Sequence, residues 1–285
     1  MELEVVDPRG DLDVSAVKIF HNGIDVTETL MRQASSSVRG EERKILLTVP
    51  VVRLPAAEDN LIEVTYQGQS GAYGYARFEE PECMAFRLHS VSNTADFSPS
   101  ERVLKMIEEE SVKEGFSPAF TAGLVAQESG FDPRVISWAK AIGLTQMTTL
   151  AEQEVIHQFP DFPRYPQAHE MPVPWLRALV MLKKMNPENE WRLDTRKSVR
   201  GGLAYAHYLA DRWSTPENLD YIRKTFPDPE MAHTQLMLAS YNAGYSRVYA
   251  SLKKHGRGWL KTQEMRGIRG YVNRTVSYCY HFSKV

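Results

Sequence analysis

The spacing of apolar residues changes near residue 98, and this change limits the possible folds more than any other feature. Before it, apolar and polar residues alternate in short segments, as in residues 61–66, and Asn, Asp and Gly separate the segments. A period of two is typical of half-buried β-strands. After it, apolar residues recur every three or four positions, as in residues 199–213, which is the spacing of a buried helix face. We therefore predict an α+β chain in which a β-domain precedes a separate all-α domain.

The first 85 residues are predicted to form a small β-sandwich from short strands joined by tight turns. Asn22-Gly23 predicts a hairpin turn, and Gly68 and Gly71 predict the turn of a last hairpin. The expected strands lie in the segments AVKIF, IDVTETL, KILLTVPVVRL, LIEVTY and AYGYARF. This pattern of strands, Asn-Gly turn and last hairpin resembles bacterial immunoglobulin-like domains.

Residues 86–97 are predicted to be a linker, and residues 98–285 an all-helical domain. Ser98 and Glu101 have the spacing of a capping box, and Ser117-Pro118 has the form of an N-cap followed by proline. One helix is expected to begin after residue 100 and another after the cap Ser198. The other expected helices cover residues 118–129, 175–184, 229–243 and 270–282. Residues 130–147 are rich in turn formers, and residues 159–172 contain four prolines. The proline-rich loop is either a groove wall or a surface excursion.

Charge and hydropathy exclude several classes of function. The chain has 34 Lys and Arg against 36 Asp and Glu, and no basic block that would suggest nucleic acid. No apolar run reaches the length of a membrane span. The N-terminus has no apolar signal-peptide segment. Either the protein is cytoplasmic, or a leader has been removed.

Cysteine and histidine spacing gives little evidence of a metal or of redox chemistry. Cys83 and Cys279 are the two cysteines, and both are either free or joined in one disulfide that closes a very long loop. The eight histidines include no HxxxH or HExxH pair, and there is no CxxC. We expect no metal and no cofactor.

Glu128 is the first candidate for chemistry. It follows Leu124 by four positions, so it lies on the same side of the predicted helix as apolar residues, and Gly130 ends that helix. Burial disfavours the ionised form and raises the pKa of the carboxyl group. A protonated acid near neutral pH is what cleavage of a glycosidic bond requires. A glutamate in the last turn of a helix is more often solvated or paired, so the interpretation depends on the segments around it.

Three ordered segments complete the pattern, and each alone has a structural explanation as a helix stop, a core helix or a polar cap. They are Glu128–Pro133 with Ser137 and Gly143–Met147, then Ser198–Tyr205, then Ala239–Gly244. In this order they resemble the catalytic domain of the soluble lytic transglycosylase and goose-type lysozyme superfamily. The resemblance covers residues 98–282 and implies an all-α, lysozyme-like domain.

By this resemblance Glu128 protonates the glycosidic oxygen of a MurNAc–GlcNAc bond in peptidoglycan. The same carboxylate then acts as the base on the C6 hydroxyl of MurNAc, which gives a 1,6-anhydro product without water. Ser137 matches a serine that contacts the acid, and Tyr241 and Asn242 match a pair over the reacting sugar. The other implied substrate contacts are Gly143, Leu144, Thr145, Gln146, Met147, Thr148, Tyr205 and Tyr271. Packing is an equal alternative for Tyr205 and Tyr271.

Hydrolysis by a lysozyme on the same fold is the nearest alternative. An inverting hydrolase needs a second carboxylate to activate water. Goose-type enzymes have aspartates at the positions of Ser137 and Thr148, and neither is acidic here. Asp132 is expected to cap a turn. Glu152 and Glu154 are candidates for the second carboxylate, or else charges on a solvated helix face.

Departures from the family pattern leave the preferred glycan open. Thr145 and Thr148 replace methionines, and Trp138 and Lys140 stand where proline and glycine are common. The two threonines and the nearby lysine motivate the hypothesis of a modified, de-N-acetylated substrate. Gly267 stands where the family often has glutamate.

Two further classes of function compete with an enzyme: a non-catalytic protein that binds the cell wall, and a factor in envelope assembly. The resemblance implies peptidoglycan glycan strands as the partner and a periplasmic or secreted location. We expect a monomer whose N-terminal β-domain is a candidate for binding a protein or a cell-wall component.

Overall fold

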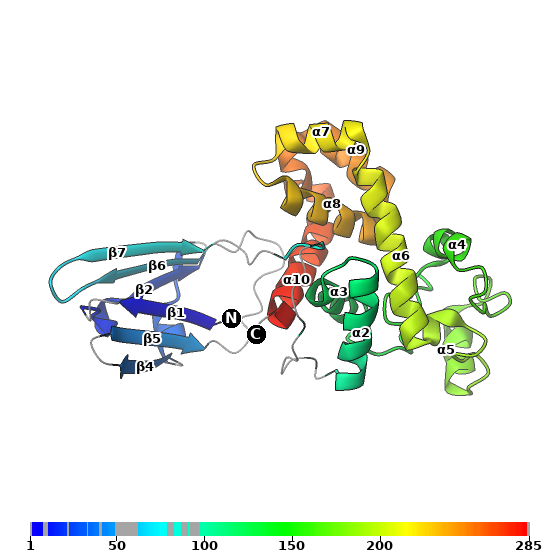
Figure 1. The fold of residues 1–285 in the computed structure, drawn as a ribbon, viewed down its shortest axis with the longest axis horizontal. Coiled ribbons are helices and arrows are strands. Elements are labelled where there is room, and N and C mark those ends of the chain that lie inside the picture. The colour runs from blue at the N-terminus through cyan, green and yellow to red at the C-terminus, as the bar shows by residue number, and fades with distance from the viewer. Residues whose placement is uncertain are drawn as a thin grey trace. The chain divides into compact units, whose positions relative to one another are not determined.

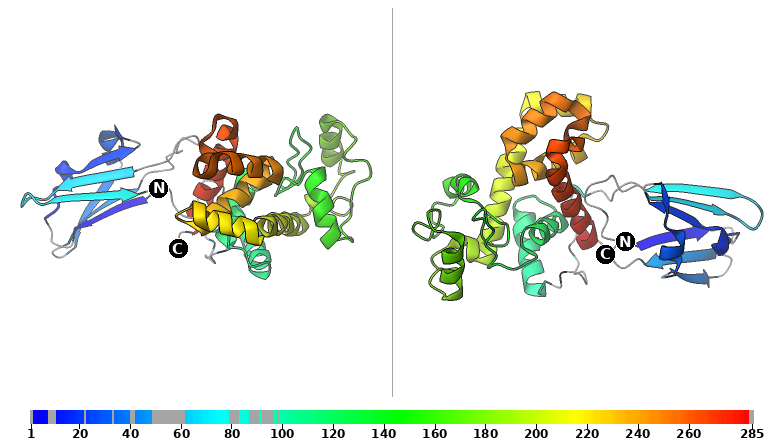
Figure 2. Two further views of the ribbon diagram at one scale, coloured as in Figure 1. Left: turned by 90° about the horizontal axis from the view of Figure 1, so that it is seen from above. Right: turned by 180° about the vertical axis from the view of Figure 1, so that it is seen from behind.

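The computed structural model describes residues 2–7, 11–21, 23–32, 34–39, 42–48, 62–78, 83–86, 91, 97 and 99–283. The chain divides into two compact units, Met1–Pro81 and Glu82–Val285. The first contains strands and the second contains helices (Figures 1 and 2). The predicted order of a β part before a helical part is therefore confirmed.

The N-terminal unit contains two antiparallel sheets. One has the strand order β1-β5-β4 and the other has the order β3-β2-β6-β7. The strands are β1 (Glu2–Asp7), β2 (Lys18–His21), β3 (Ile24–Asp25), β4 (Ala34–Arg39), β5 (Glu42–Thr48), β6 (Ile62–Gln67) and β7 (Tyr73–Phe78). Six buried apolar residues, Leu12, Val17, Ile19, Leu30, Ile62 and Val64, form a small core. An immunoglobulin-like sandwich stays a prediction.

Both predicted hairpins form. Phe20 pairs with Asp25 and His21 pairs with Ile24, and β6 pairs with β7 around Gly68 and Gly71. Residues 49–61, which include the end of KILLTVPVVRL, lie outside the described residues.

The strand expected in IDVTETL is wrong after its second residue, because the segment turns into helix α1 (Thr27–Met31). An Asp25 carboxylate oxygen accepts a hydrogen bond from the Thr27 amide at 2.9 Å. The Thr27 hydroxyl oxygen accepts a hydrogen bond from the Ile19 amide at 2.8 Å. These short-range bonds divert the backbone from a continuous ladder.

The first described residues after Pro81 pack with the helices rather than with the sheets. Cys83 and Ala85 are buried in the helical core, and Cys83 forms a disulfide with Cys279 across 196 positions. The predicted end of the β-domain at residue 85 therefore lies four residues after Pro81, where the first compact unit ends. Of the two alternatives for the cysteines, the disulfide is the one that forms, and it lies within the second unit.

The second unit has nine α-helices among its described residues. They are α2 (Glu101–Lys113), α3 (Pro118–Ser129), α4 (Thr149–Gln158), α5 (Val173–Met181), α6 (Thr195–Trp213), α7 (Pro216–Thr225), α8 (Pro229–Ala243), α9 (Tyr245–His255) and α10 (Arg266–Ser283). Helix α3 is the centre of the core, because every residue from Pro118 to Ala126 is buried. Its bounds match the prediction, and Ser117 accepts from the Phe120 amide as its N-cap.

Two helix starts show where local signals succeed and fail. Helix α8 begins at Pro229 as predicted, and Asp228 caps it by accepting from the Met231 amide. Ser198 is wrong as a cap, because α6 begins at Thr195 and Asp194 accepts from the Lys197 amide. Ser198 is instead fully buried inside α6. Helices α4, α7 and α9 are absent from the expected elements.

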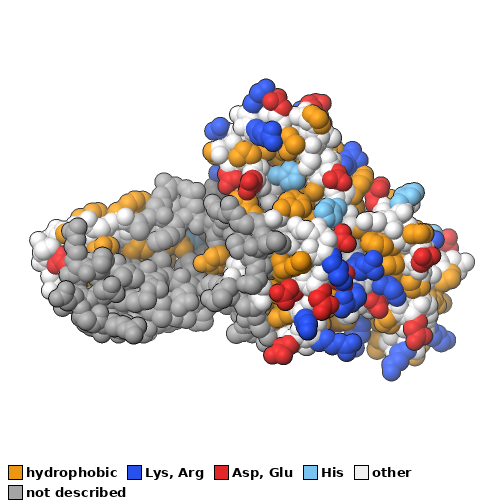
Figure 3. Space-filling model, viewed as in Figure 1, with side chains coloured by type: hydrophobic (Ala, Val, Ile, Leu, Met, Phe, Trp, Pro, Cys, Tyr) orange, Lys and Arg blue, Asp and Glu red, His pale blue; other side chains and the backbone are white. Residues whose placement is uncertain are grey.

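Charged side chains of both signs gather on the face over α2 and the start of α6 (Figure 3). Arg196 bonds Glu109 and Glu110, and Arg200 lies 3.8 Å from Glu110. These pairs attach α6 to α2.

None of the described helices has the length and apolar composition that a membrane span needs.

Candidate active site

Close packing of α3 against α10 brings Glu128 of α3 next to Tyr271 of α10. Gly123 has no room for a Cβ atom, which would lie 2.5 Å from the Cys279 backbone nitrogen. The two helices can approach this closely only because position 123 is glycine. One turn further along α3, Arg274 donates to the Gln127 side chain at 3.0 Å. The Tyr271 hydroxyl donates a hydrogen bond to Glu128 Oε1.

The environment of Glu128 raises its pKa from the ordinary value of 4.5 to about 7. Burial is the main cause, since an ionised carboxylate is poorly solvated at the end of this buried helix. The Tyr271 hydrogen bond acts in the opposite direction and limits the rise. The carboxyl group can therefore both give and take a proton near neutral pH.

Tyr271 and Tyr241 are neutral phenols beside this carboxyl group. Burial, followed by the charge of Glu128, raises the pKa of both hydroxyls well above the ordinary value. The Tyr241 hydroxyl donates to the Thr145 carbonyl oxygen at 2.9 Å. Tyr241 therefore bonds the backbone of the turn, while Tyr271 is the phenol that bonds Glu128.

Tyr205 of α6 extends this aromatic group. Its ring packs edge-on against Tyr241, with centroids 5.3 Å apart. Burial is the largest cause that raises its pKa, and the nearby charge of Glu154 adds to it. Tyr205 therefore lies near the site, while Asn242 is exposed one residue after Tyr241.

Helix α6 contacts and supports the turn from Gly143 to Met147. Thr145 is buried, and its hydroxyl donates to the Ser198 carbonyl oxygen at 2.8 Å. Gly202 makes room for it, because a Cβ there would lie 2.5 Å from the Thr145 methyl group. Leu144 and Met147 are fully buried. Their side chains support the turn, so only its backbone is available for a substrate contact from these positions.

Gln146 and Ser137 bond to the protein's own backbone. The Gln146 amide donates to the carbonyl oxygens of Val135 at 3.0 Å and Gly143 at 2.9 Å. The Ser137 hydroxyl oxygen accepts from the Ala141 amide at 3.0 Å. The expected contact between Ser137 and the acid stays a prediction.

The residues that suggested a modified glycan have internal partners. Thr148 caps α4 by accepting from the Ala151 amide. Lys140 donates to the His169 carbonyl oxygen at 2.7 Å, which fastens the proline-rich loop. With Thr145 buried as well, these three side chains give no support to a preference for de-N-acetylated sugar.

The acidic residues near Glu128 in sequence differ in availability. Glu152 accepts from the Trp191 ring nitrogen at 3.1 Å and lies 3.6 Å from buried Arg192. Asp132 caps a turn as predicted, by accepting from the Arg134 amide at 2.9 Å. Glu154 is exposed on α4. Within the described ranges no group of three His, Cys, Asp or Glu side chains could hold a metal ion.

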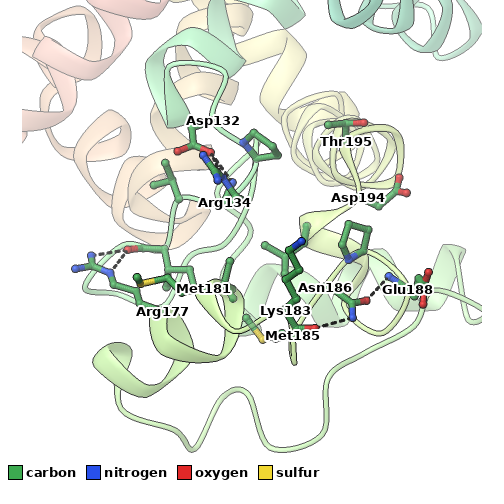
Figure 4. Close-up of a pocket in the computed structure, with 16 residues that line it drawn as sticks. Asp132, Arg134, Arg177, Met181, Lys183, Met185, Asn186, Glu188, Asp194 and Thr195 are labelled. Atoms are coloured by element: carbon green, nitrogen blue, oxygen red, sulfur yellow. Dashed lines mark hydrogen bonds and ion pairs between the residues drawn. The ribbon is translucent and has the colours of Figure 1, made fainter.

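A cavity of about 1060 Å³ lies between residues 132–136, α5 and the start of α6 (Figure 4). Its lining includes Arg134, Arg177, Met185 and Asp194. The Val135 carbonyl oxygen accepts from the Gly143 amide at 3.0 Å. One segment therefore forms a wall of the cavity and also supports the turn at 143–147.

Sequence reasoning missed the supporting role of Ser198 and the exposure of Trp138. The Ser198 backbone holds Thr145 across 53 positions, a contact for which helix periodicity gives no signal. Trp138 is 76% exposed, and its position within a turn-rich segment is the signal that could have indicated it.

Comparison with known proteins identifies one segment of the chain. Residues 105–163 match the model of the transglycosylase SLT domain. The soluble lytic transglycosylase SLT70 of Escherichia coli is a similar solved structure, with 18% identity over 62% of this chain and 23% of that one, and a TM-score of 0.43. An inactive glutamate-to-glutamine mutant of lytic transglycosylase Slt from Pseudomonas aeruginosa has 20% identity over 64% and 24%, and a TM-score of 0.42.

The chain thus spans about a quarter of the length of each of these two proteins. No curated protein matches it. The family match includes Glu128 and the turn at 143–147, whereas the second and third motif segments lie beyond it. The resemblance that the motifs indicate is confirmed for this segment, because residues 105–163 match the transglycosylase SLT domain.

Proposed function

We propose that the helical unit is a lytic transglycosylase that cleaves the glycan strands of peptidoglycan, with Glu128 as its catalytic acid and base. The observation that carries this proposal is a glutamate whose pKa is about 7, bonded to Tyr271 and close enough for its charge to act on Tyr241, which bonds the turn at 143–147. The family match over residues 105–163 supports the substrate class.

Protonated Glu128 gives its proton to the glycosidic oxygen between MurNAc and GlcNAc, and the bond from that oxygen to C1 breaks. GlcNAc leaves with a new hydroxyl group. The carboxylate then takes the proton of the MurNAc C6 hydroxyl, whose oxygen bonds to C1. The product is a 1,6-anhydro sugar, no water is consumed, and Glu128 is protonated again. A pKa near the working pH suits both transfers.

Hydrolysis on the same site is the second candidate function, and Glu154 is the observation that keeps it open. Its charge contributes to the raised pKa of Tyr205, so it lies within electrostatic reach of the aromatic group. Glu152 is a poor base, because Trp191 and Arg192 already bind its two oxygens. The transglycosylase is favoured since it needs a single carboxylate.

The substrate implies a periplasmic or secreted protein. The N-terminal unit is proposed to be an immunoglobulin-like domain that binds a protein or cell-wall partner, and the protein is proposed to act as a monomer. Binding without cleavage and a role in envelope assembly are the outcomes that remain if the enzyme assay fails.

The test is clearing of purified peptidoglycan by wild type, Glu128→Gln and Glu154→Gln. The proposal predicts activity for wild type and Glu154→Gln and a loss of at least about a thousandfold for Glu128→Gln. Equal clearing by Glu128→Gln would reject the acid. Loss of activity in Glu154→Gln would favour hydrolysis.

A further inference from the structure

Trp138 is a large apolar side chain that the helical unit leaves in water. Of its surface, 76% is exposed. The Arg177 guanidinium lies over the ring, 4.9 Å from its centroid. Because the arginine covers one face and most of the residue is exposed, the opposite face of the indole is open to solvent.

The backbone that carries Trp138 is fastened at several points. The Lys140 amide donates to the Ser137 carbonyl oxygen at 3.0 Å and closes a turn with Trp138 at its corner. Arg177 donates to the Ile136 carbonyl oxygen through two nitrogens, at 3.2 and 2.6 Å. Lys140 is itself bonded to His169. An aromatic ring held in one orientation loses little conformational entropy on binding.

The turn is continuous with the candidate active site. Ile136 pairs with Ile142, and Ile142 pairs with Met147, the last residue of the turn at 143–147. Trp138 is two residues beyond Ile136, at the corner of the 137–140 turn that joins Ile136 to Ile142, so it lies within about 7 Å of Ile136 along the chain. Trp138 therefore belongs to the same small hairpin that carries the turn at 143–147.

We propose that Trp138 is a sugar-binding platform that contacts a glycan ring away from the bond that is cleaved. The proposal rests on the proposed function. A pyranose ring has a face of C–H groups that packs on an aromatic ring, while its hydroxyl groups at the edge remain in water. A strand long enough to reach Trp138 gains this contact, and a short fragment does not.

The experiment compares cleavage of long glycan strands and of short fragments by wild type, Trp138→Ala, Trp138→Phe and Trp175→Ala. Trp175 is the matched control, because it is 69% exposed on α5 and lies outside the hairpin that carries the turn. We expect Trp138→Ala to lose about tenfold in kcat/KM on long strands only. Trp138→Phe keeps an aromatic face and should lose no more than about threefold. Trp175→Ala should match wild type.

Binding separates this proposal from the proposed function. Glu128→Gln, with and without Trp138→Ala, is sedimented with intact sacculi, and the tryptophan change is expected to weaken binding about tenfold. If Glu128→Gln still cleaves, the catalytic assignment fails, but this comparison still decides the role of Trp138. Equal binding with and without Trp138→Ala, or equal loss in Trp175→Ala, would overturn the proposal. Unchanged thermal unfolding of the variants excludes misfolding as the cause.

Discussion

The raised pKa of Glu128 makes the stability of the protein depend on pH in a way that Glu128→Gln should remove. Between the ordinary value of 4.5 and about 7, the folded state holds a proton that the unfolded state has lost. Wild-type stability therefore falls as pH rises through this window, by up to about 1.4 kcal/mol per pH unit. Above the folded pKa the loss is complete and amounts to up to about 3 kcal/mol, while below pH 4.5 it is absent.

The assay is urea unfolding of wild type, Glu128→Gln and the exposed control Glu154→Gln at pH values from 4 to 8. Glutamine cannot ionise, so Glu128→Gln should gain stability relative to wild type as pH rises and reach a plateau above about pH 7. Glu154→Gln should follow wild type. A difference between Glu128→Gln and wild type that is constant with pH, or that shrinks as pH rises, would refute the argument from burial.

Three other predictions concern the supports of the site. Tyr271→Phe removes the hydrogen-bond donor that lowers the pKa of Glu128, so that pKa should rise. Because the reaction needs protonated Glu128, the alkaline limb of the pH–rate profile should move to higher pH. Reduction of the Cys83–Cys279 disulfide should cost about 2–5 kcal/mol, measured by unfolding with and without reductant, and an unchanged midpoint would contradict it. Gly123→Ala should cost about 1–3 kcal/mol through its clash with α10. The control Gly267→Ala, which meets no atom within 4 Å, should unfold no earlier than wild type.

Much of the helical unit could be predicted because its signals are local. Ser117-Pro118 and Gly130 mark the two ends of α3, and Asp228 marks the start of α8. The inward position of Glu128 follows from the same periodicity, since helix phase places it one turn from Leu124. The amino-acid sequence alone therefore predicts the direction in which the pKa of Glu128 shifts.

The partners of the site side chains could not be predicted, because they depend on which helices touch. Tyr271 matches an aromatic position of the family, but its bond to Glu128 needs the approach of α3 and α10 at Gly123. Thr145 is an expected substrate contact, and the sequence gives no sign that its hydroxyl bonds the Ser198 carbonyl oxygen of α6. In each case a contact across many residues outweighs the local pattern.

The central claim is that Glu128 alone serves as both acid and base, and the products of digestion test it most directly. Purified sacculi are digested by wild type and by Glu128→Gln in heavy-oxygen water, and the fragments are analysed by mass spectrometry. We predict that wild type gives 1,6-anhydroMurNAc ends without heavy oxygen, and that Glu128→Gln gives no fragments. Reducing ends that carry heavy oxygen, or the same fragments from both proteins, would contradict the account.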